Sequence, residues 1–171
     1  FQRRADRHAG KEQRGSFLHS QTERHRAQAA SAIKRAERNV QQGVVGKAIA
    51  LASSAHFNEI KDAALQLVRR IKDIELSEMI GAVKQVSEYK LEINDFFDIL
   101  MIWYRDVLLY KATADVNGLI FKDEVYEVKK QANTSSYHGI ECKLNALDKA
   151  KARLNANVNF DLVIELLLLT L

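Results

Sequence analysis

The sequence predicts an all-α protein, a helical bundle of five to six helices, and three observations support this fold class. The 171 residues include no proline, so few positions force a helix to break. Apolar residues recur at steps of three and four along several segments, which is the spacing of an amphipathic helix. No segment shows the alternation of apolar and polar residues that a half-buried β-strand produces.

Charge divides the chain into two parts. Residues 1–42 carry ten Lys and Arg against four Asp and Glu, a net charge of +6, whereas residues 43–171 carry sixteen against eighteen, a net charge of −2. The first part also has only five large apolar residues, too few for a stable helix face. We therefore expect a basic N-terminal segment with a short helical remnant over residues 1–54 and a helical domain over residues 55–171.

Glycines, serines and the spacing of apolar residues predict the first helices of residues 43–171. Two glycines open a short helix over residues 43–52, and Ser53 or Ser54 offers an N-cap for the next helix, predicted over residues 57–74. Another helix is expected to begin at Ser77. The two apolar stripes consist of Phe57, Ile60, Ala64, Leu67, Val68, Ile71 and Ile74, and of Ile80, Val83, Val86 and Tyr89.

The next helix is expected to be the central one. Asn94 is its predicted cap, and it runs from residue 95 to about Thr113. Its apolar residues lie on several sides: Phe96, Phe97, Ile99, Leu100, Ile102, Trp103, Val107, Leu108 and Leu109. A helix that is apolar nearly all round lies in the middle of a domain.

An Asn-Gly turn over residues 115–118 ends the central helix, and another helix is predicted over residues 122–131. Ser135 or Ser136 is expected to cap a long helix that runs to about Asn155. The inward residues of these two helices are predicted to be Val125 and Val128 in the first, and Ile140, Leu144, Leu147 and Leu154 in the second.

Asn157 and Asn159 are predicted to cap the closing helix, residues 160–171. Its apolar run is too short to span a membrane, which takes about twenty apolar residues. Four consecutive leucines cover all sides of a helix, and one small domain is not expected to bury every side. We therefore predict that this helix contacts another subunit, and the candidate contact residues are Leu167, Leu168 and Leu171.

Two carboxylates fall inside strongly apolar helices, Asp106 and Glu165. A carboxylate that is partly buried must be paired or hydrogen-bonded. The expected partners are Arg105, Lys111 or Arg153, and a structural ion pair is the favoured interpretation over a catalytic one.

Gly43, Gly46 and Lys47 resemble part of a phosphate-binding P-loop, but the pattern is incomplete. It needs a glycine five residues before Gly46, where Gln41 stands, and Ser or Thr after the lysine, where Ala48 stands. Without that hydroxyl the segment lacks a Mg²⁺ ligand, so we expect no nucleotide hydrolysis there.

The five histidines and the single cysteine predict neither a metal site nor a nucleophile. The histidines do not have the spacing of a helical zinc protease, and Cys142 cannot form an internal disulfide or a multi-cysteine zinc site. We expect Cys142 to pack as a small hydrophobe in a reducing, cytoplasmic protein. The sequence therefore predicts no enzyme, no cofactor and no catalytic residue.

Three segments taken together resemble the delta-prime subunits of bacterial DNA polymerase III clamp loaders. They are Gly-Val-Val-Gly-Lys-Ala at residues 43–48, Trp-Tyr-Arg-Asp-Val-Leu-Leu-Tyr-Lys at residues 103–111, and residues 149–168, which include Asn-Val-Asn-Phe-Asp-Leu-Val-Ile-Glu. The resemblance covers residues 43–171. Over residues 1–42 the chain is arginine-rich where the family has amphipathic lid helices.

The resemblance implies a lid-domain remnant followed by a C-terminal helical collar domain. In that family, the collar domains of five subunits pack into a ring, and the loader places the sliding clamp on primed DNA with ATP bound by its motor subunits. The implied role is non-catalytic assembly in DNA replication. The implied partners are the delta and gamma/tau subunits, with DNA reached only through the complex and no membrane.

Within that interpretation, Trp103 is expected to anchor the core, while Arg105 and Asp106 orient the central helix. The alternative function is a helical DNA-binding module that uses the basic N-terminal arm, since phosphate contacts need such charge.

Overall fold

The computed structural model of the chain describes residues 27, 30, 31 and 34 and residues 55–171. Residues 55–171 contain six α-helices and two short 3₁₀-helices, and residues 27, 30, 31 and 34 are also helical. These described residues include no β-strand, so the predicted all-α fold class is confirmed. The helices are α3 (Ala55–Arg70), η1 (Leu76–Glu78), α4 (Met79–Ser87), α5 (Ile93–Thr113), η2 (Lys122–Glu124), α6 (Val125–Thr134), α7 (Tyr137–Asn155) and α8 (Phe160–Leu168). The predicted helix over residues 43–52 and the serine cap that follows it lie outside the described residues.

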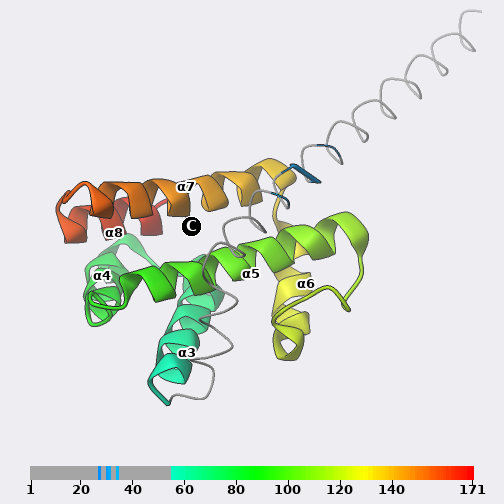
Figure 1. Ribbon diagram of the computed structural model, residues 1–171, viewed down its shortest axis with the longest axis horizontal. Helices are drawn as coiled ribbons and strands as arrows, with labels where there is room; N and C mark the ends of the chain where they lie inside the picture. Colours follow the sequence, from blue (N-terminus) through cyan, green and yellow to red (C-terminus); the bar gives the residue numbers. More distant parts are fainter. Residues whose placement is uncertain (1–26, 28–29, 32–33, 35–54) are drawn as a thin grey trace, which may run out of the picture.

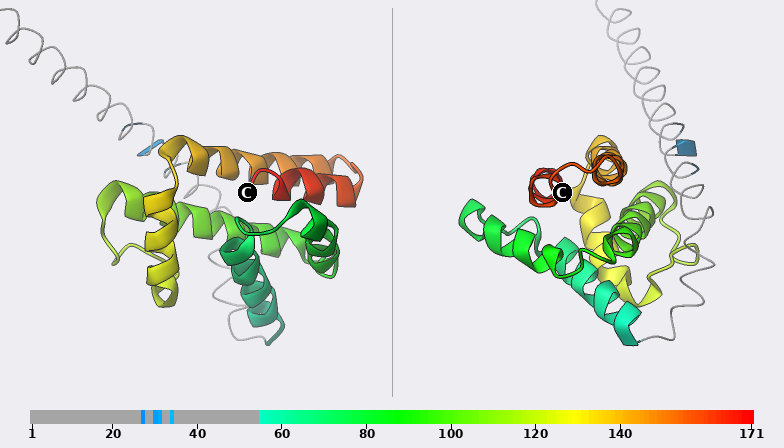
Figure 2. Two further views of the ribbon diagram at one scale, coloured as in Figure 1. Left: turned by 180° about the vertical axis from the view of Figure 1, so that it is seen from behind. Right: turned by 60° about the vertical axis from the view of Figure 1, so that its left-hand side comes forward.

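Helix α5 is the centre of the domain, as its all-round apolar sequence predicts. Helices α3, α6 and α7 each pack against it, while α8 packs on α4 and α7. Figures 1 and 2 show α7 and α8 side by side along one face of the domain, with α3 and α6 on the opposite side of α5. The largest fully buried side chains include Trp103, Tyr104, Phe96 and Phe97, all from α5.

The start of α5 corrects the predicted cap. The helix begins at Ile93 with Glu92 at the N-cap position, and no side chain caps it. Ile93 is itself buried, with 7% of its surface exposed. Burial of this apolar side chain draws the helix start to a position before Asn94, so Asn94 lies inside the first turn and is not the cap.

The buried stripe of α4 also differs from the prediction. Helix α4 follows η1 directly, and its buried residues are Met79, Ala82 and Val86. The predicted stripe residue Ile80 is 69% exposed, because it lies about 100° around the helix from Met79. Val86 was predicted correctly, and the prediction for Ile80 was wrong.

The two closing helices have the side-chain caps that short polar residues provide. Ser136 Oγ accepts a hydrogen bond from the Gly139 N–H at 2.9 Å, so Ser136 is the cap of α7. Asn159 Oδ1 accepts from the Leu162 N–H at 3.0 Å at the start of α8, as predicted. Asn157 does not cap α8; it lies just after α7 in the left-handed region, with φ of 56°.

Candidate protein interface

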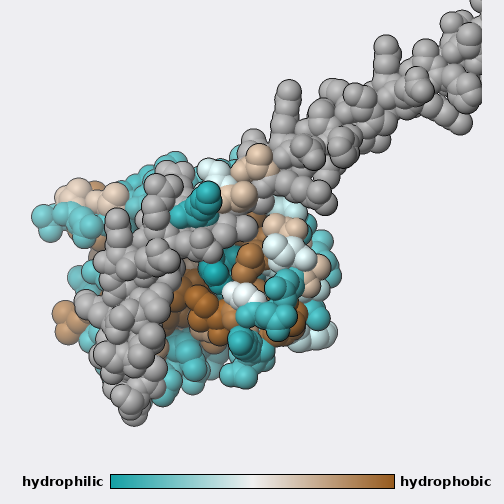
Figure 3. Space-filling model, turned by 45° about the vertical axis from the view of Figure 1, so that its right-hand side comes forward, coloured by the Kyte–Doolittle hydropathy of each residue, from teal (hydrophilic) through white to brown (hydrophobic). Residues whose placement is uncertain are grey.

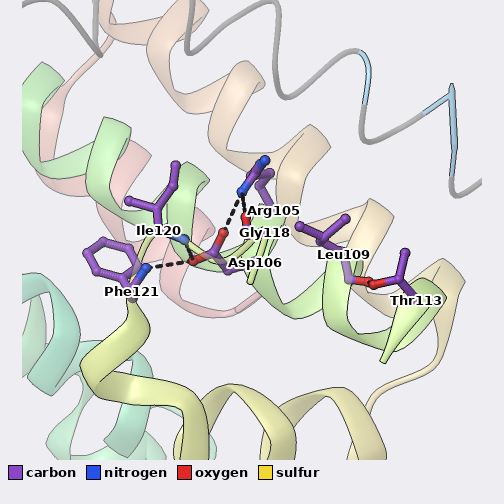
Figure 4. Close-up of polar contacts among 7 residues, drawn as sticks. All are labelled: Arg105, Asp106, Leu109, Thr113, Gly118, Ile120 and Phe121. Atoms are coloured by element: carbon purple, nitrogen blue, oxygen red, sulfur yellow. Dashed lines mark hydrogen bonds and ion pairs between the residues drawn. The ribbon is translucent and has the colours of Figure 1, made fainter. Parts of the chain in front are cut away.

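A buried carboxylate fixes the connection between α5 and α6 (Figure 4). Asp106 is 0% exposed. Its Oδ1 accepts from Arg105 Nη1 at 2.8 Å, and its Oδ2 accepts from the backbone N–H groups of Ile120 and Phe121 at 2.7 and 2.8 Å. Arg105 Nη1 also donates to the Gly118 carbonyl at 3.0 Å. One ion pair therefore holds the loop before η2 against α5.

The surroundings of Asp106 favour a structural role over acid–base chemistry. Burial raises the pKa of this carboxyl above its usual range, although hydrogen bonds from Phe121, Arg105 and Ile120 and the charge of Arg105 act in the opposite direction. A side chain with no exposed surface is not accessible to a substrate. The pairing with Arg105 agrees with one of the partners expected from the sequence.

Trp103 is buried at the contact between α5 and α6, with 1% of its surface exposed. Its indole Nε1 donates to Gln131 Oε1 in α6, so the polar edge of the ring is satisfied while the rest packs in the core. The Trp103 ring also lies 6.1 Å from the Phe121 ring, centroid to centroid. This position fits the core-anchor role that the resemblance implies.

Two further groups near α5 carry shifted pKa values. Burial raises the pKa of the Tyr104 hydroxyl above its usual range. Lys143 in α7 lies over the Tyr104 ring at 5.1 Å from the centroid, and burial together with the nearby charge of Lys72 lowers its pKa to about 8. Lys143 and Tyr104 thus lie in contact between α7 and α5, and the buried Tyr104 hydroxyl has no hydrogen-bond partner among the described residues. We assign neither group a chemical step.

The expectation for Glu165 was wrong. Glu165 is exposed on α8, so it does not need a buried partner. The proposed partner Lys111 instead donates to the Ala132 carbonyl at 2.9 Å and lies over the Tyr137 ring at 5.1 Å. Lys111 thus joins the end of α5 to α6 and α7.

The residues of the closing helix that were predicted to contact another subunit are buried within the domain itself. Leu167, Leu168 and Leu171 are 3%, 3% and 8% exposed, and Val163 and Ile164 are 0% exposed. These five side chains pack in the core shared with the other helices. The structure therefore corrects the prediction that the three leucines contact another subunit, because they have almost no surface left for a partner.

The opposite side of α8 carries a second apolar face. Leu162, Leu166 and Leu169 are 49%, 42% and 57% exposed. At about 100° per residue, positions i, i+4 and i+7 lie within an arc of about 60°, directly opposite the buried residues. We call these three residues the outer leucine face. A helix that is apolar on both sides has one side left for another surface to cover.

Apolar side chains elsewhere on the surface are more scattered. Figure 3, with the α6 side of the molecule brought forward, shows hydrophobic residues at the surface among hydrophilic ones. Other exposed large apolar residues are spread over α4, α6 and the connections on either side of α5: Ile80, Leu91, Ile120 and Tyr126. Single exposed apolar residues are normal in soluble proteins, whereas a contiguous set marks an interaction site. The outer leucine face is the set with regular helical spacing.

The described residues offer little for small-molecule or metal chemistry. They contain no group of three or more His, Cys, Asp or Glu side chains that could hold a metal ion. His138 Nε2 and Cys142 Sγ lie 3.5 Å apart on α7, and no third residue of these types completes a metal site within the described part of the chain. A surface cavity of about 350 Å³ lies between α3 and α4 and includes Leu67, Arg70 and Gly81 among its lining residues. None of its lining residues belongs to α8.

The outer leucine face did not emerge from the sequence, although one signal for it was present. The whole closing helix is more apolar than a single core contact requires. Which of its leucines are buried depends on which side of the helix faces α4 and α7. Four leucines in a row place an apolar residue on every side, so the sequence does not identify the buried ones. The i, i+4 and i+7 spacing of Leu162, Leu166 and Leu169 was the signal that could have identified the face.

The predicted family-motif residues Gly43, Gly46 and Lys47 lie outside the described residues. The described helices α3–α8 form a helical domain with an exposed apolar face on α8. Within them, no helix combines the length and the apolarity needed to cross a membrane.

The family model described as DNA polymerase III, delta subunit, C terminal, matches residues 54–171. The chain therefore belongs to this family, and residues 54–171 form the C-terminal domain of a clamp-loader protein. Comparison with curated proteins and comparison with solved structures each find no match.

Proposed function

We propose that this chain is a non-catalytic structural subunit of the DNA polymerase III clamp loader, of the delta-prime type. Its C-terminal domain joins the ring-shaped collar that supports loading of the sliding clamp in DNA replication. The family match supports the loader assignment, and the similarity of residues 103–111 and 149–168 supports the delta-prime type. We place the boundary between the basic N-terminal segment, with its lid remnant, and the collar domain at residues 54 and 55, and the protein in the cytoplasm.

The observation that carries this proposal is the second apolar face of α8. Three leucines that are roughly half exposed cost free energy in water, and covering each with a partner contributes about 1 kcal/mol. A stable interface between subunits resembles a domain core cut in half. Helix α8 already packs on α4 and α7 through its inner side, so its outer side can extend that core across a boundary between subunits.

The partners that we propose are the delta and gamma/tau subunits of the same loader, with DNA reached only through the complex. The rival function, DNA binding by the basic arm, draws on residues 1–42 and leaves the outer leucine face without a role. Deletion of residues 1–42 separates the two proposals. Assembly with the other loader subunits should survive the deletion, whereas salt-sensitive DNA binding should be lost if the rival holds.

The direct test mixes the full chain with separately purified delta and gamma/tau subunits and follows the mass of the complex by size-exclusion chromatography with light scattering. Leu166→Glu should prevent or strongly weaken assembly because it places a charge in the centre of the outer leucine face. Tyr126→Glu is the matched control, because Tyr126 is 76% exposed and lies on α6 at the other end of the domain. Equal assembly by the wild type and Leu166→Glu would contradict the proposal.

A further inference from the structure

We infer that the surface covering the outer leucine face is an amphipathic helix with an aliphatic stripe flanked by Lys or Arg, and not a second copy of this chain. This inference rests on the proposed function and adds the chemistry of the partner. The observations behind it are the shape of the leucine face, the charges along its edge and the composition of α8.

The shape of the exposed surface fits another helix. Leu162, Leu166 and Leu169 follow i, i+4 and i+7 spacing, which forms one ridge along α8. Such a ridge fits the groove between rows of side chains on a neighbouring helix. Helix α8 spans nine residues, about 13 Å, so two to three turns of a partner helix are enough to cover it.

One edge of the leucine face is acidic. Asp161 and Glu165 are both exposed and lie four residues apart on the same side of α8. Asp161 Oδ1 accepts a hydrogen bond from Ser87 Oγ at 3.3 Å, which supplies no positive charge. Glu165 has no ion-pair partner among the described residues. The domain's own Lys90 Nζ lies 5.2 Å from the centroid of the ring of Phe160, the residue directly before Asp161. A cation that pairs with Glu165 therefore comes from outside the domain.

A second copy of the chain cannot supply that cation through the same helix. Residues 160–171 contain Asp161 and Glu165 and no Lys, Arg or His. In a two-fold symmetric contact centred on α8, the two copies of α8 would face each other. In an antiparallel pair the acidic edges would lie against each other and repel. Charge complementarity therefore favours a different helix with a basic edge.

The test uses Glu165→Lys in the full chain, with Glu165→Gln as the milder variant. Glu165 is exposed, so neither change removes a core contact. The control is Glu59→Lys on α3, which makes the same change in net charge at an exposed position on a helix that packs against α5. Affinity for the delta and gamma/tau subunits is measured by titration at low and high salt, and self-association by light scattering.

We expect Glu165→Lys to weaken binding by roughly fivefold or more at low salt, with a smaller loss at high salt, because rim charges are screened. Glu165→Gln should lie between, and Glu59→Lys should bind like the wild type. Suppose that Leu166→Glu abolishes binding while Glu165→Lys binds as well as the wild type or better. The outer leucine face is then the contact surface, but the inference that the partner helix is basic is wrong. If the wild type self-associates through Leu166, the occupant is a second copy. If no loader subunit binds at all, the proposed function fails together with this inference.

Discussion

The Arg105 guanidinium lies 2.8 Å from the Asp106 carboxylate, its immediate neighbour in α5, and the same nitrogen also reaches the Gly118 carbonyl. Neighbouring residues on a helix normally point about 100° apart. Here the long arginine side chain turns toward Asp106 and the returning loop. The Arg105–Asp106 pair thus joins α5 to the loop that follows it, before η2.

Asp106→Ala should destabilise the domain by about 3 kcal/mol, because two backbone N–H groups and a partly buried guanidinium lose this acceptor. Urea unfolding followed by circular dichroism measures this change. Asp123→Ala, at an exposed position in η2 of the same region, is the control and should cost much less. A loss below about 1 kcal/mol for Asp106→Ala would mean that the Arg105–Asp106 ion pair contributes little to folding stability.

The raised pKa of Asp106 predicts a specific pH dependence. Because the folded pKa lies above the unfolded value, the folded state holds the proton more tightly. The part of the stability that depends on protonation of Asp106 is therefore fully present below the unfolded pKa and is lost as pH rises through the folded pKa, while the hydrogen bonds that the carboxylate accepts remain. The free energy of unfolding of the wild type, minus that of Asp106→Asn, should fall as pH rises from the unfolded pKa through the folded pKa of Asp106. A difference that grows with pH would contradict the assigned direction.

Ala114→Gly should stabilise the domain. Ala114 ends α5 in the left-handed region, with φ of 57°, and its N–H donates to the Tyr110 carbonyl at 2.7 Å. This conformation costs an L-residue about 1 kcal/mol that glycine avoids. Ala112→Gly, inside the same helix, is the control and should destabilise by about 1 kcal/mol. The two variants should therefore shift the thermal midpoint in opposite directions, and equal shifts would disprove this interpretation.

The two sides of α8 should respond differently to truncation in the isolated chain. Leu168→Ala is expected to cost about 3 kcal/mol of folding stability, because Leu168 is 3% exposed in the core. Leu166→Ala should cost less than about 1 kcal/mol, because a large part of its side chain is already in water. Denaturant unfolding of both variants gives the comparison, and similar losses would place Leu166 in the core as well.

Most of the fold follows from the sequence because helix spacing and capping are local properties. Ser136 and Asn159 lie directly before predicted helices and cap α7 and α8, as short polar residues do. The all-round apolar sequence of α5 likewise indicates its central position. Asp106 was recognisable as a buried carboxylate because it lies within the apolar run of α5, and its adjacent arginine supplied the partner.

The errors arise where tertiary packing selects among local alternatives. Asn94 is a good cap residue, yet burial of Ile93 starts α5 earlier. Ile80 and Met79 are both apolar, and the packing of α4 decides which of them is covered. On α8 the same problem is larger, since leucines cover every side and the neighbours α4 and α7 decide which ones are buried. No pattern within the helix itself can make that choice.

Hydroxyl-radical footprinting of the full chain, alone and assembled with the delta and gamma/tau subunits, measures directly whether a partner covers the outer leucine face. We predict that oxidation of Leu162, Leu166 and Leu169 falls severalfold on assembly, while Leu168 reacts little in either state. Leu91, which is 93% exposed on the turn between α4 and α5, serves as the internal reference. Unchanged oxidation of the three outer leucines in the assembled loader would show that no partner lies on this face.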